Sequence, residues 1–254
     1  MIFVAMLSGG IGTRMKLDKP KQFEIVGNKP ILAHSIEKFL EVDEIDKIIV
    51  SSPESHITTT KDLIKNYFND DSRIVVILGG ETRNGTILNS IDYVKSNYDD
   101  GDHILITHDA PRIFVSTELI RKSIEELEDH DAASPVIPAV DVIFESKEKG
   151  KLTDIPLRKN LVHSQTPQSF KINKFLEIYQ DLSEDEISKL DEAMMLFFLR
   201  DGNISLFEGD PSNFKITRKI DLKIAEAYLN EWGKPWILVN FIENYLKKYR
   251  TLKN

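Results

Sequence analysis

The chain opens with an apolar run and a glycine-rich loop, IFVAMLSGGIGTRMKLDKPKQF (residues 2–23). Every position of Ile2–Leu7 is apolar, which is typical of a strand buried on both faces of a parallel sheet. The glycines behind it let backbone N–H groups approach a ligand, because no Cβ intervenes, and phosphates are the usual ligands of such loops. Arg14, Lys21 and two further lysines add positive charge. We therefore expect an α/β fold whose first loop binds phosphate; a solvated surface loop is the alternative.

The loop matches neither of two familiar phosphate-binding motifs. GIGTRM (residues 10–15) begins like the dinucleotide fingerprint, but Met15 stands where close helix packing demands Gly or Ala. No Gly-Lys-Ser/Thr follows at the spacing of a P-loop. The cations suit a triphosphate that loses pyrophosphate, because Arg and Lys stabilise the developing charge. A nicotinamide-dependent reductase is the rival interpretation, which Met15 and the lysines disfavour.

Short apolar runs alternate with segments of helical period over the first 130 residues. Strands are expected at residues 2–7, 47–51, 73–78 and 103–107. Helices are expected at residues 31–40, 54–68 and 83–98, where apolar residues recur three or four apart. This alternation predicts a doubly wound, mostly parallel sheet covered by helices on both sides.

The middle of the chain interrupts this alternation. In VDVIFESKEKGKLTDIPL (residues 140–157), two strand-like pieces flank a charged turn. The pattern predicts a hairpin that projects from the sheet as a β-arm over about residues 138–160. Such an arm often serves an interface between subunits.

The last part of the chain returns to helical patterns. We expect helices over residues 172–200, a strand at 204–209, the short FKIT at 214–217, and a helix at 219–229. After a Gly/Pro break, residues 230–254 are expected to form a separate amphipathic helix with a basic end.

The composition of the whole chain narrows its function. With 254 residues and a formal net charge of −8, the chain is acidic, which argues against a general nucleic-acid binder. It has no cysteine, so disulfides, thiolate nucleophiles and cysteine-ligated metals are excluded. The N-terminal apolar stretch follows no positive region and is too short to span a membrane. We therefore expect a cytoplasmic protein that does not act on membranes.

A second motif of interest is ILITHDAPRIF (residues 104–114), an apolar strand that ends in a carboxylate. Asp109 would lie at the carboxyl edge of the sheet, where open α/β folds bind ligands. Mg²⁺ takes one or two protein carboxylates and completes its shell with phosphate oxygens and water. Asp109 is therefore a candidate Mg²⁺ ligand; an Asp that only bonds the following turn is the alternative.

A third motif is LGGETRNGTI (residues 78–87), where another expected strand ends in glycines. Gly80, Arg83 and Thr86 follow it, and the backbone there could contact a nucleotide base. Alternatively, these residues turn the chain and cap the next helix.

Other chemistry has less support. His103 and His108 lie five apart on one expected strand, so they point to opposite faces and cannot share a metal. The remaining histidines lack zinc spacing. No Gly-x-Ser-x-Gly is present and the chain has no cysteine, so a hydrolase triad has little support.

Together, these motifs resemble the cytidylyltransferase family that includes 2-C-methylerythritol 4-phosphate and ribitol-5-phosphate cytidylyltransferases. The resemblance covers residues 1–229 and rests on six pieces in this order: GGIGTRM with PKQF, GGETRNGTI, ITHDAPR, IPLR, QTPQSF and FKIT. It implies one Rossmann-like nucleotidyltransferase domain over 1–229, with a β-arm for dimerisation and residues 230–254 as an extension. It also implies CTP as one substrate, a polyol phosphate as the other, Mg²⁺ as cofactor, and a homodimer.

The resemblance assigns roles to individual residues. Those expected to hold the nucleotide are Leu7, Ser8, Gly9, Gly10, Gly12, Gly80, Arg83, Thr86 and Asp109. Those expected to contact phosphates in catalysis are Arg14, Lys21 and Lys215, with Asp109 organising Mg²⁺. Those expected to bind the acceptor are Arg112, Asp141, Arg158 and Thr166, Arg158 reaching the site from the arm of a partner subunit.

The acceptor can be narrowed to two candidates. IPLRKNL (residues 155–161), QTPQSF (165–170) and the segment 183–202 look more like the ribitol branch. We therefore expect D-ribitol 5-phosphate as acceptor and CDP-ribitol, a precursor of teichoic-acid or capsule polymers, as product; 2-C-methyl-D-erythritol 4-phosphate of isoprenoid synthesis is the alternative. The chain departs from the family pattern at Pro111 and Ile113, beside Arg112, and at Val142, and these departures bear on which acceptor is bound.

A catalytically silent nucleotide-binding homologue is a further alternative, which the retained cations and Asp109 disfavour.

Overall fold

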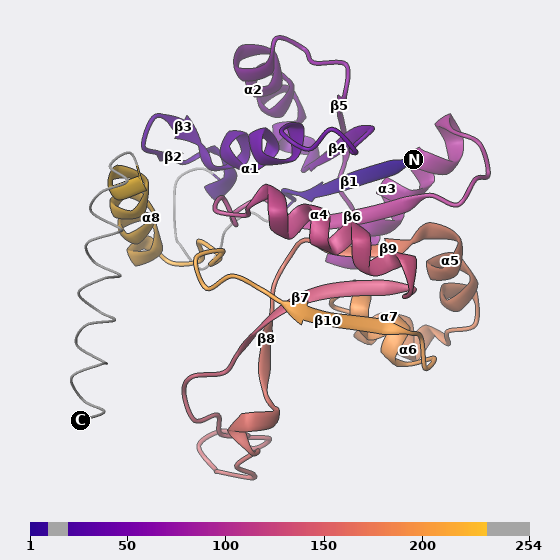
Figure 1. The fold of residues 1–254 in the computed structure, drawn as a ribbon, viewed down its shortest axis with the longest axis vertical. Helices are drawn as coiled ribbons and strands as arrows, with labels where there is room; N and C mark the ends of the chain where they lie inside the picture. The colour runs from indigo at the N-terminus through magenta and orange to yellow at the C-terminus, as the bar shows by residue number, and fades with distance from the viewer. Residues whose placement is uncertain (10–19, 233–254) are drawn as a thin grey trace.

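The computed structural model describes residues 1–9 and 20–232 (Figure 1). Gly10, Gly12 and Arg14 of the first loop, and residues 233–254 of the expected extension, lie outside the described residues. The strands are β1 (Ile2–Leu7), β2 (Ile25–Val26), β3 (Lys29–Pro30), β4 (Lys47–Ser52), β5 (Ile74–Leu78), β6 (Ile104–Asp109), β7 (Ala132–Pro138), β8 (Val162–Ser164), β9 (Gln168–Lys171) and β10 (Ile204–Glu208). The four strands expected in the first half are therefore confirmed, with shifts of one or two residues at their ends.

The central sheet is mostly parallel, as expected. Its strand order is β10-β7-β9-β6-β1-β4-β5, with β8 pairing with β7 off this path. β1 is parallel to β4 and β6, β4 is parallel to β5, and β10 is parallel to β7. Strand β9 runs antiparallel to both β6 and β7. The sheet thus has two parallel parts joined by one antiparallel strand.

Helices cover both faces of the sheet, which makes the fold doubly wound (Figure 1). The α-helices are α1 (Ile31–Leu40), α2 (Ile57–Phe68), α3 (Arg83–Asn97), α4 (Thr117–Glu125), α5 (Ile172–Gln180), α6 (Glu184–Lys189), α7 (Ala193–Phe198) and α8 (Lys219–Trp232). α1, α2 and α4 pack on one face, whereas α3, α5 and α7 pack on the other. Successive β1 residues alternate accordingly, because Val4 and Met6 contact the first layer while Phe3 and Ala5 contact the second.

The arm between β7 and β8 extends away from the sheet (Figure 1), but it is not the two-stranded hairpin that the sequence predicts. A single antiparallel bridge joins Glu145 and Asp154 instead of paired strands. The apolar residues that gave the strand-like pattern are exposed; they are Val140, Val142, Ile143, Phe144, Leu152, Ile155 and Leu157. A hairpin needs a sheet or a core on one face, and the arm packs on neither within its own chain.

The C-terminal half also differs in detail from expectation. The single helical stretch expected over residues 172–200 is three short helices, because Ser183 begins α6 with a capping box and Glu192 begins α7. FKIT (residues 214–217) is neither helix nor strand. α8 continues to Trp232, past its expected end at residue 229, and packs near β2. Among the described residues, the helices include none that is long and apolar enough to cross a membrane.

Candidate active site

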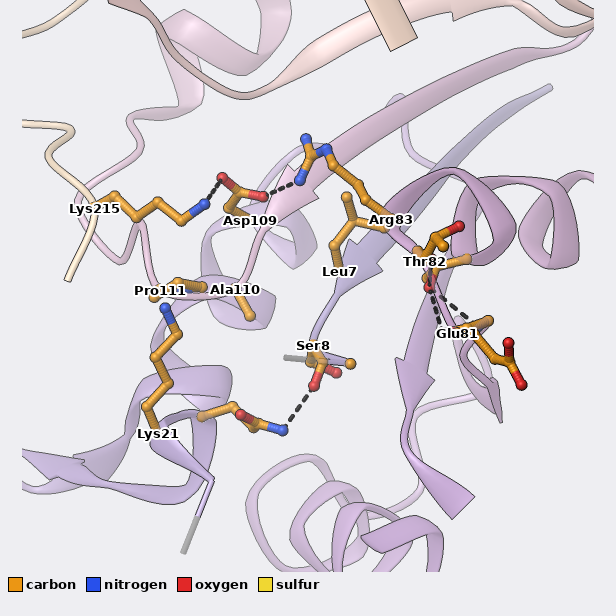
Figure 2. A pocket seen from close by; sticks show the side chains of 14 residues that line it. Leu7, Ser8, Lys21, Glu81, Thr82, Arg83, Asp109, Ala110, Pro111 and Lys215 are labelled. Carbon is orange, nitrogen blue, oxygen red and sulfur yellow. Dashed lines mark hydrogen bonds and ion pairs between the residues drawn. The ribbon is translucent and has the colours of Figure 1, made fainter. Parts of the chain in front are cut away.

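A cavity of about 260 Å³ opens at the carboxyl ends of β1 and β6 (Figure 2). Four segments far apart in the sequence build it: the end of β1, η2 (Lys21–Phe23), the loop from β5 into α3, and the turn after β6. Lys215 enters from the FKIT loop. Its lining residues include Leu7, Ser8, Gly9, Lys21, Gly80, Arg83, Thr86, Asp109 and Lys215, all of which the sequence singled out. The sheet brings the segments after β1, β5 and β6 to one edge because these strands run parallel and end there.

Asp109, the last residue of β6, is the centre of a charge cluster in this cavity. Lys215 Nζ lies 2.7 Å from Asp109 Oδ2, and Arg83 Nη1 donates a hydrogen bond to Asp109 Oδ1 (Figure 2). Arg112 Nε is 3.8 Å from Asp109 Oδ2. One carboxylate therefore faces three cations, and the cluster carries a net positive charge suited to a polyphosphate.

These cations keep Asp109 ionised. Burial alone would raise the pKa of Asp109, but the charges of Arg83 and Lys215, with their hydrogen bonds, outweigh it and hold the pKa well below its usual range. Burial lowers the pKa of Arg112, although the guanidinium keeps its charge at neutral pH. The site thus presents fixed charges, rather than a proton donor or acceptor, to whatever it binds.

The turn after β6 is fixed by a buried hydrogen-bond network. Thr166 Oγ1 accepts a hydrogen bond from the backbone N–H of Asp109 at 3.1 Å and donates one to His108 Nδ1 at 3.1 Å. His108 Nε2 then donates to the Arg112 carbonyl at 3.1 Å. Burial lowers the pKa of His108 to about 3, so the ring is neutral and carries one N–H, as these partners require. His108 is therefore a structural residue that positions Asp109.

The FKIT loop is attached to the same turn, which explains how Lys215 reaches Asp109 across 106 residues of sequence. The backbone N–H of Ile216 donates to the Pro111 carbonyl at 2.9 Å, and Lys21 Nζ donates to the Ile216 carbonyl at 3.2 Å. Asn213 Nδ2 donates to the Thr166 carbonyl at 2.8 Å. Lys215 is thus held by hydrogen bonds that residues on both sides of it, Asn213 and Ile216, make to other segments.

The loop from β5 into α3 combines both alternatives that its sequence left open. Thr82 caps α3, since its side chain accepts from the backbone N–H of Gly85. Gly80 packs against the first turn of α3, where an added Cβ would lie 2.6 Å from Thr86 N. Thr86 Oγ1 accepts from Gly80 N at 3.0 Å. The glycine is therefore required by close backbone approach, while Gly80, Arg83 and Thr86 still line the cavity.

One lining residue that the sequence analysis did not assign is Gln22. It is buried, and its Nε2 donates to the Ser8 carbonyl at 2.6 Å, which ties the segment carrying Lys21 to the end of β1. Gln22 stands in the PKQF motif, so its sequence position could have suggested a role. The backbone carbonyl that its amide contacts comes near only in the folded chain.

A second cavity of about 430 Å³ adjoins the first and shares Arg83, Asp109 and Lys215 with it. Arg112 and Thr166, both expected to bind the acceptor, line this second cavity. Its other lining residues are Ser164, Gln165, Gln168, Asp191 and Glu192, which the sequence analysis did not single out. The shared cluster around Asp109 is where ligands in the two cavities would meet.

Two further acceptor residues expected from the sequence lie elsewhere. Asp141 and Arg158 are exposed on the arm and line neither cavity of their own chain. Arg158 Nη1 donates to the Val140 carbonyl at 3.0 Å. Gly10, Gly12 and Arg14 fall outside the described residues.

The fold and the cationic cavity define the class of protein: an α/β nucleotidyltransferase. The family model of 2-C-methyl-D-erythritol 4-phosphate cytidylyltransferase, IspD, matches residues 2–231. The chain therefore belongs to the IspD family of cytidylyltransferases.

Solved structures agree with this assignment. The 4-diphosphocytidyl-2C-methyl-D-erythritol synthase of Anaerococcus prevotii is 25% identical, with a TM-score of 0.72, covering 90% of this chain and 94% of that one. The Francisella tularensis 2-C-methyl-D-erythritol 4-phosphate cytidylyltransferase is 27% identical, with a TM-score of 0.74, over 88% and 97% of the two chains. The Thermus thermophilus enzyme of that name, 22% identical with a TM-score of 0.68 over 89% and 97%, shares the fold.

Proposed function

We propose that the protein transfers a cytidylyl group from CTP to 2-C-methyl-D-erythritol 4-phosphate and releases pyrophosphate. The observation that carries the proposal is the cluster of Asp109, Arg83 and Lys215, shared by two adjoining cavities, in a chain matched over residues 2–231 by that family. Two solved enzymes at least 25% identical to this chain bear the name of that activity. The sequence analysis ranked this acceptor second, and the comparisons support it better than the ribitol phosphate ranked first.

The reaction needs no protein nucleophile. An oxygen of the acceptor phosphate attacks the α-phosphorus of CTP in line, a new P–O bond forms, and the bond to the β-phosphate oxygen breaks as pyrophosphate leaves. In the proposal, CTP occupies the first cavity and the acceptor occupies the second. Lys21 and Lys215 neutralise the triphosphate, while Arg112 holds the acceptor phosphate, so the chain contributes positioning and charge stabilisation.

Mg²⁺ is part of the proposal, and the residues present fit a metal ion that takes one ligand from the protein and the others from the substrate and water. Within residues 1–9 and 20–232, no group of three or more His, Asp or Glu is arranged to hold a metal ion. Asp109 is an ionised carboxylate beside a cavity suited to phosphates, and Mg²⁺ commonly uses one or two protein carboxylates and takes its other ligands from substrate phosphates and water. Bound there, Mg²⁺ would add positive charge next to the departing pyrophosphate.

We also propose that two chains form a homodimer in which Arg158 of each arm binds the acceptor phosphate in the partner's second cavity. The arm supports this, because its apolar side chains are exposed in the isolated chain and Arg158 is remote from its own cavities. Asp141 at the base of the same arm would reach that site with it.

D-ribitol 5-phosphate is a second candidate acceptor, favoured by the sequence of residues 155–161 and 165–170. The experiment that decides between the two measures pyrophosphate release from CTP and Mg²⁺ with each acceptor offered separately. Turnover with 2-C-methyl-D-erythritol 4-phosphate, at a kcat/KM well above that for ribitol 5-phosphate, is the expected result. The reverse order would replace the proposed acceptor, and no release with either, together with no rise in Tm on adding CTP, would reject cytidylyl transfer.

A further inference from the structure

The second cavity contains two carboxylates that the proposed chemistry does not use. Its lining combines the three cations that gather around Asp109, which are Arg83, Arg112 and Lys215, with the side chains of Asp191 and Glu192. A phosphate is attracted to the cations and repelled by carboxylates, whereas a neutral hydroxyl can donate to a carboxylate. The cavity therefore suits a ligand that carries both a phosphate and uncharged hydroxyls.

Glu192 is held in place by a residue that is itself buried. Glu192 is the N-cap residue immediately before α7, but its side chain makes no cap hydrogen bond there. Instead, its Oε2 accepts a hydrogen bond from Gln168 Nε2 at 3.2 Å. Gln168 Nε2 also donates to Ser164 Oγ at 3.0 Å, so the amide orients the carboxylate from the adjoining β9. A carboxylate accepts several hydrogen bonds, so this contact leaves Glu192 able to accept more.

Gln168 holds this carboxylate from a buried position. Its side chain is 1% exposed, and the residue belongs to the wall of the second cavity. Its Nε2 makes its hydrogen bonds within the chain, to Ser164 and Glu192, so it orients the carboxylate without shielding it from a ligand. The hydroxyl groups of a polyol are donors that such a carboxylate can accept.

We propose that Glu192, assisted by Asp191, determines acceptor specificity by accepting hydrogen bonds from the hydroxyl end of the polyol phosphate, and that it excludes acceptors whose far end is acidic. This inference rests on the proposed function and adds which feature of the acceptor the protein recognises, namely its terminal hydroxyl groups. Both candidate acceptors end in a primary alcohol, so the inference holds for either. It orients the acceptor with its phosphate at Arg112 and its terminal alcohol at Glu192.

The test compares alcohol and acid forms of the same ligand. The KM for the preferred polyol phosphate is measured beside the inhibition constant of its own acid form, in which a carboxylate replaces the terminal alcohol. That acid is 2-C-methyl-4-phosphoerythronate for 2-C-methyl-D-erythritol 4-phosphate and 5-phosphoribonate for ribitol 5-phosphate. The variants are Glu192→Gln and, as matched control, Glu177→Gln on the exposed face of α5. In Glu192→Gln, the ratio of the acid's inhibition constant to the KM of the alcohol should fall at least about tenfold. The substitution removes the repulsion between Glu192 and the carboxylate of the acid, and it replaces the charged acceptor of the alcohol's hydrogen bond by a neutral amide. The KM for CTP and the Glu177→Gln values should stay at wild-type levels.

An unchanged ratio in a folded Glu192→Gln protein would overturn the inference while leaving the proposed function intact. If that variant does not fold, the same ratio in Asp191→Asn takes its place, with a fall expected and no change counting against the inference. A wild-type protein that turns over neither polyol phosphate would instead overturn the proposed function, and the inference with it.

Discussion

The cavity around Asp109 and the arm between β7 and β8 differ in how their side chains are held. In the cavity, Asp109, Lys215 and Thr166 make hydrogen bonds or ion pairs to other parts of the same chain. In the arm, Phe144, Leu157 and their apolar neighbours are exposed, and one bridge replaces a hairpin. The contrast is between side chains that contacts within a single chain already hold and side chains that, in the proposed homodimer, a second chain would cover.

The largest effect is expected at the core of the cavity. Lys215→Met removes a cation that the proposed reaction uses to stabilise the departing pyrophosphate, and it should lower kcat by about 10²–10³-fold, as removal of a preorganised electrostatic group does in other enzymes. Steady-state pyrophosphate release gives the value. Lys219→Met, at the exposed start of α8, is the matched control. A loss below tenfold would place catalytic charge stabilisation elsewhere.

The next effect tests the arm. Arg158→Ala should raise the KM for the acceptor by about 10- to 100-fold, as loss of one charged hydrogen bond does, with the KM for CTP unchanged. Mixing equal amounts of unfolded Arg158→Ala and Lys215→Met chains and refolding them should restore about a quarter of wild-type activity, since half of the dimers are mixed and each has one intact site. If the refolded mixture regains no activity, the arm does not contribute Arg158 to the site of a partner chain. The contrast between the cavity and the arm would then disappear.

A smaller effect is expected for the network that supports Asp109. Thr166→Val keeps the size of the side chain but leaves the buried N–H of Asp109 without its acceptor, which should reduce the free energy of unfolding by about 1–2 kcal/mol. Urea denaturation followed by tryptophan fluorescence or circular dichroism measures it. Thr166→Ser retains the hydroxyl and should stay close to wild type; no loss in Thr166→Val, or a larger loss in Thr166→Ser, would show that packing of the methyl group, not the hydrogen bonds, is what matters.

The last effect, similar in size to that of Thr166→Val, is a pH dependence of stability. The pKa of His108 is about 3 in the folded protein and near 6.5 in the unfolded chain, so unfolded chains take up the additional proton as the pH falls below 6.5. The resulting loss of stability approaches about 1.4 kcal/mol per pH unit. The depressed pKa of Asp109 acts in another window, since its contribution is present above pH 3.8 and is lost below it. Unfolding free energies at pH 7, 6 and 5 should therefore fall more steeply for wild type than for His108→Gln, and parallel profiles would contradict the assignment of a neutral His108.

The elements that sequence analysis predicted well are those fixed by local patterns. The apolar runs of β1, β4, β5 and β6 and the helical periods of α1 and α3 all appear with nearly the expected ends. The prediction of a two-stranded hairpin in the arm was wrong. The apolar residues of the arm have the pattern of a strand, but the arm has no sheet on which a strand could pack.

The candidate site divides in a similar way. Asp109, Arg83 and Lys215 could be predicted because they stand in short motifs whose order is specific to the family. Gln22 and Glu192 could not, because only the folded chain shows which group each contacts: the Ser8 carbonyl for one, and the amide of Gln168 for the other.

Strand β9 also bears on the order in which the chain folds. It inserts between β6 and β7, so its pairing with β6 closes a segment of roughly 60 residues that contains the whole arm. The β1–β6 pairing closes a still longer segment, of roughly 100 residues. Thr166 and Lys215 reach Asp109 across 57 and 106 residues of sequence. Contacts over such separations form only after the entropy of loop closure has been overcome, whereas helices need local contacts alone. Acquisition of CTP binding during refolding is therefore expected to lag behind the formation of helices.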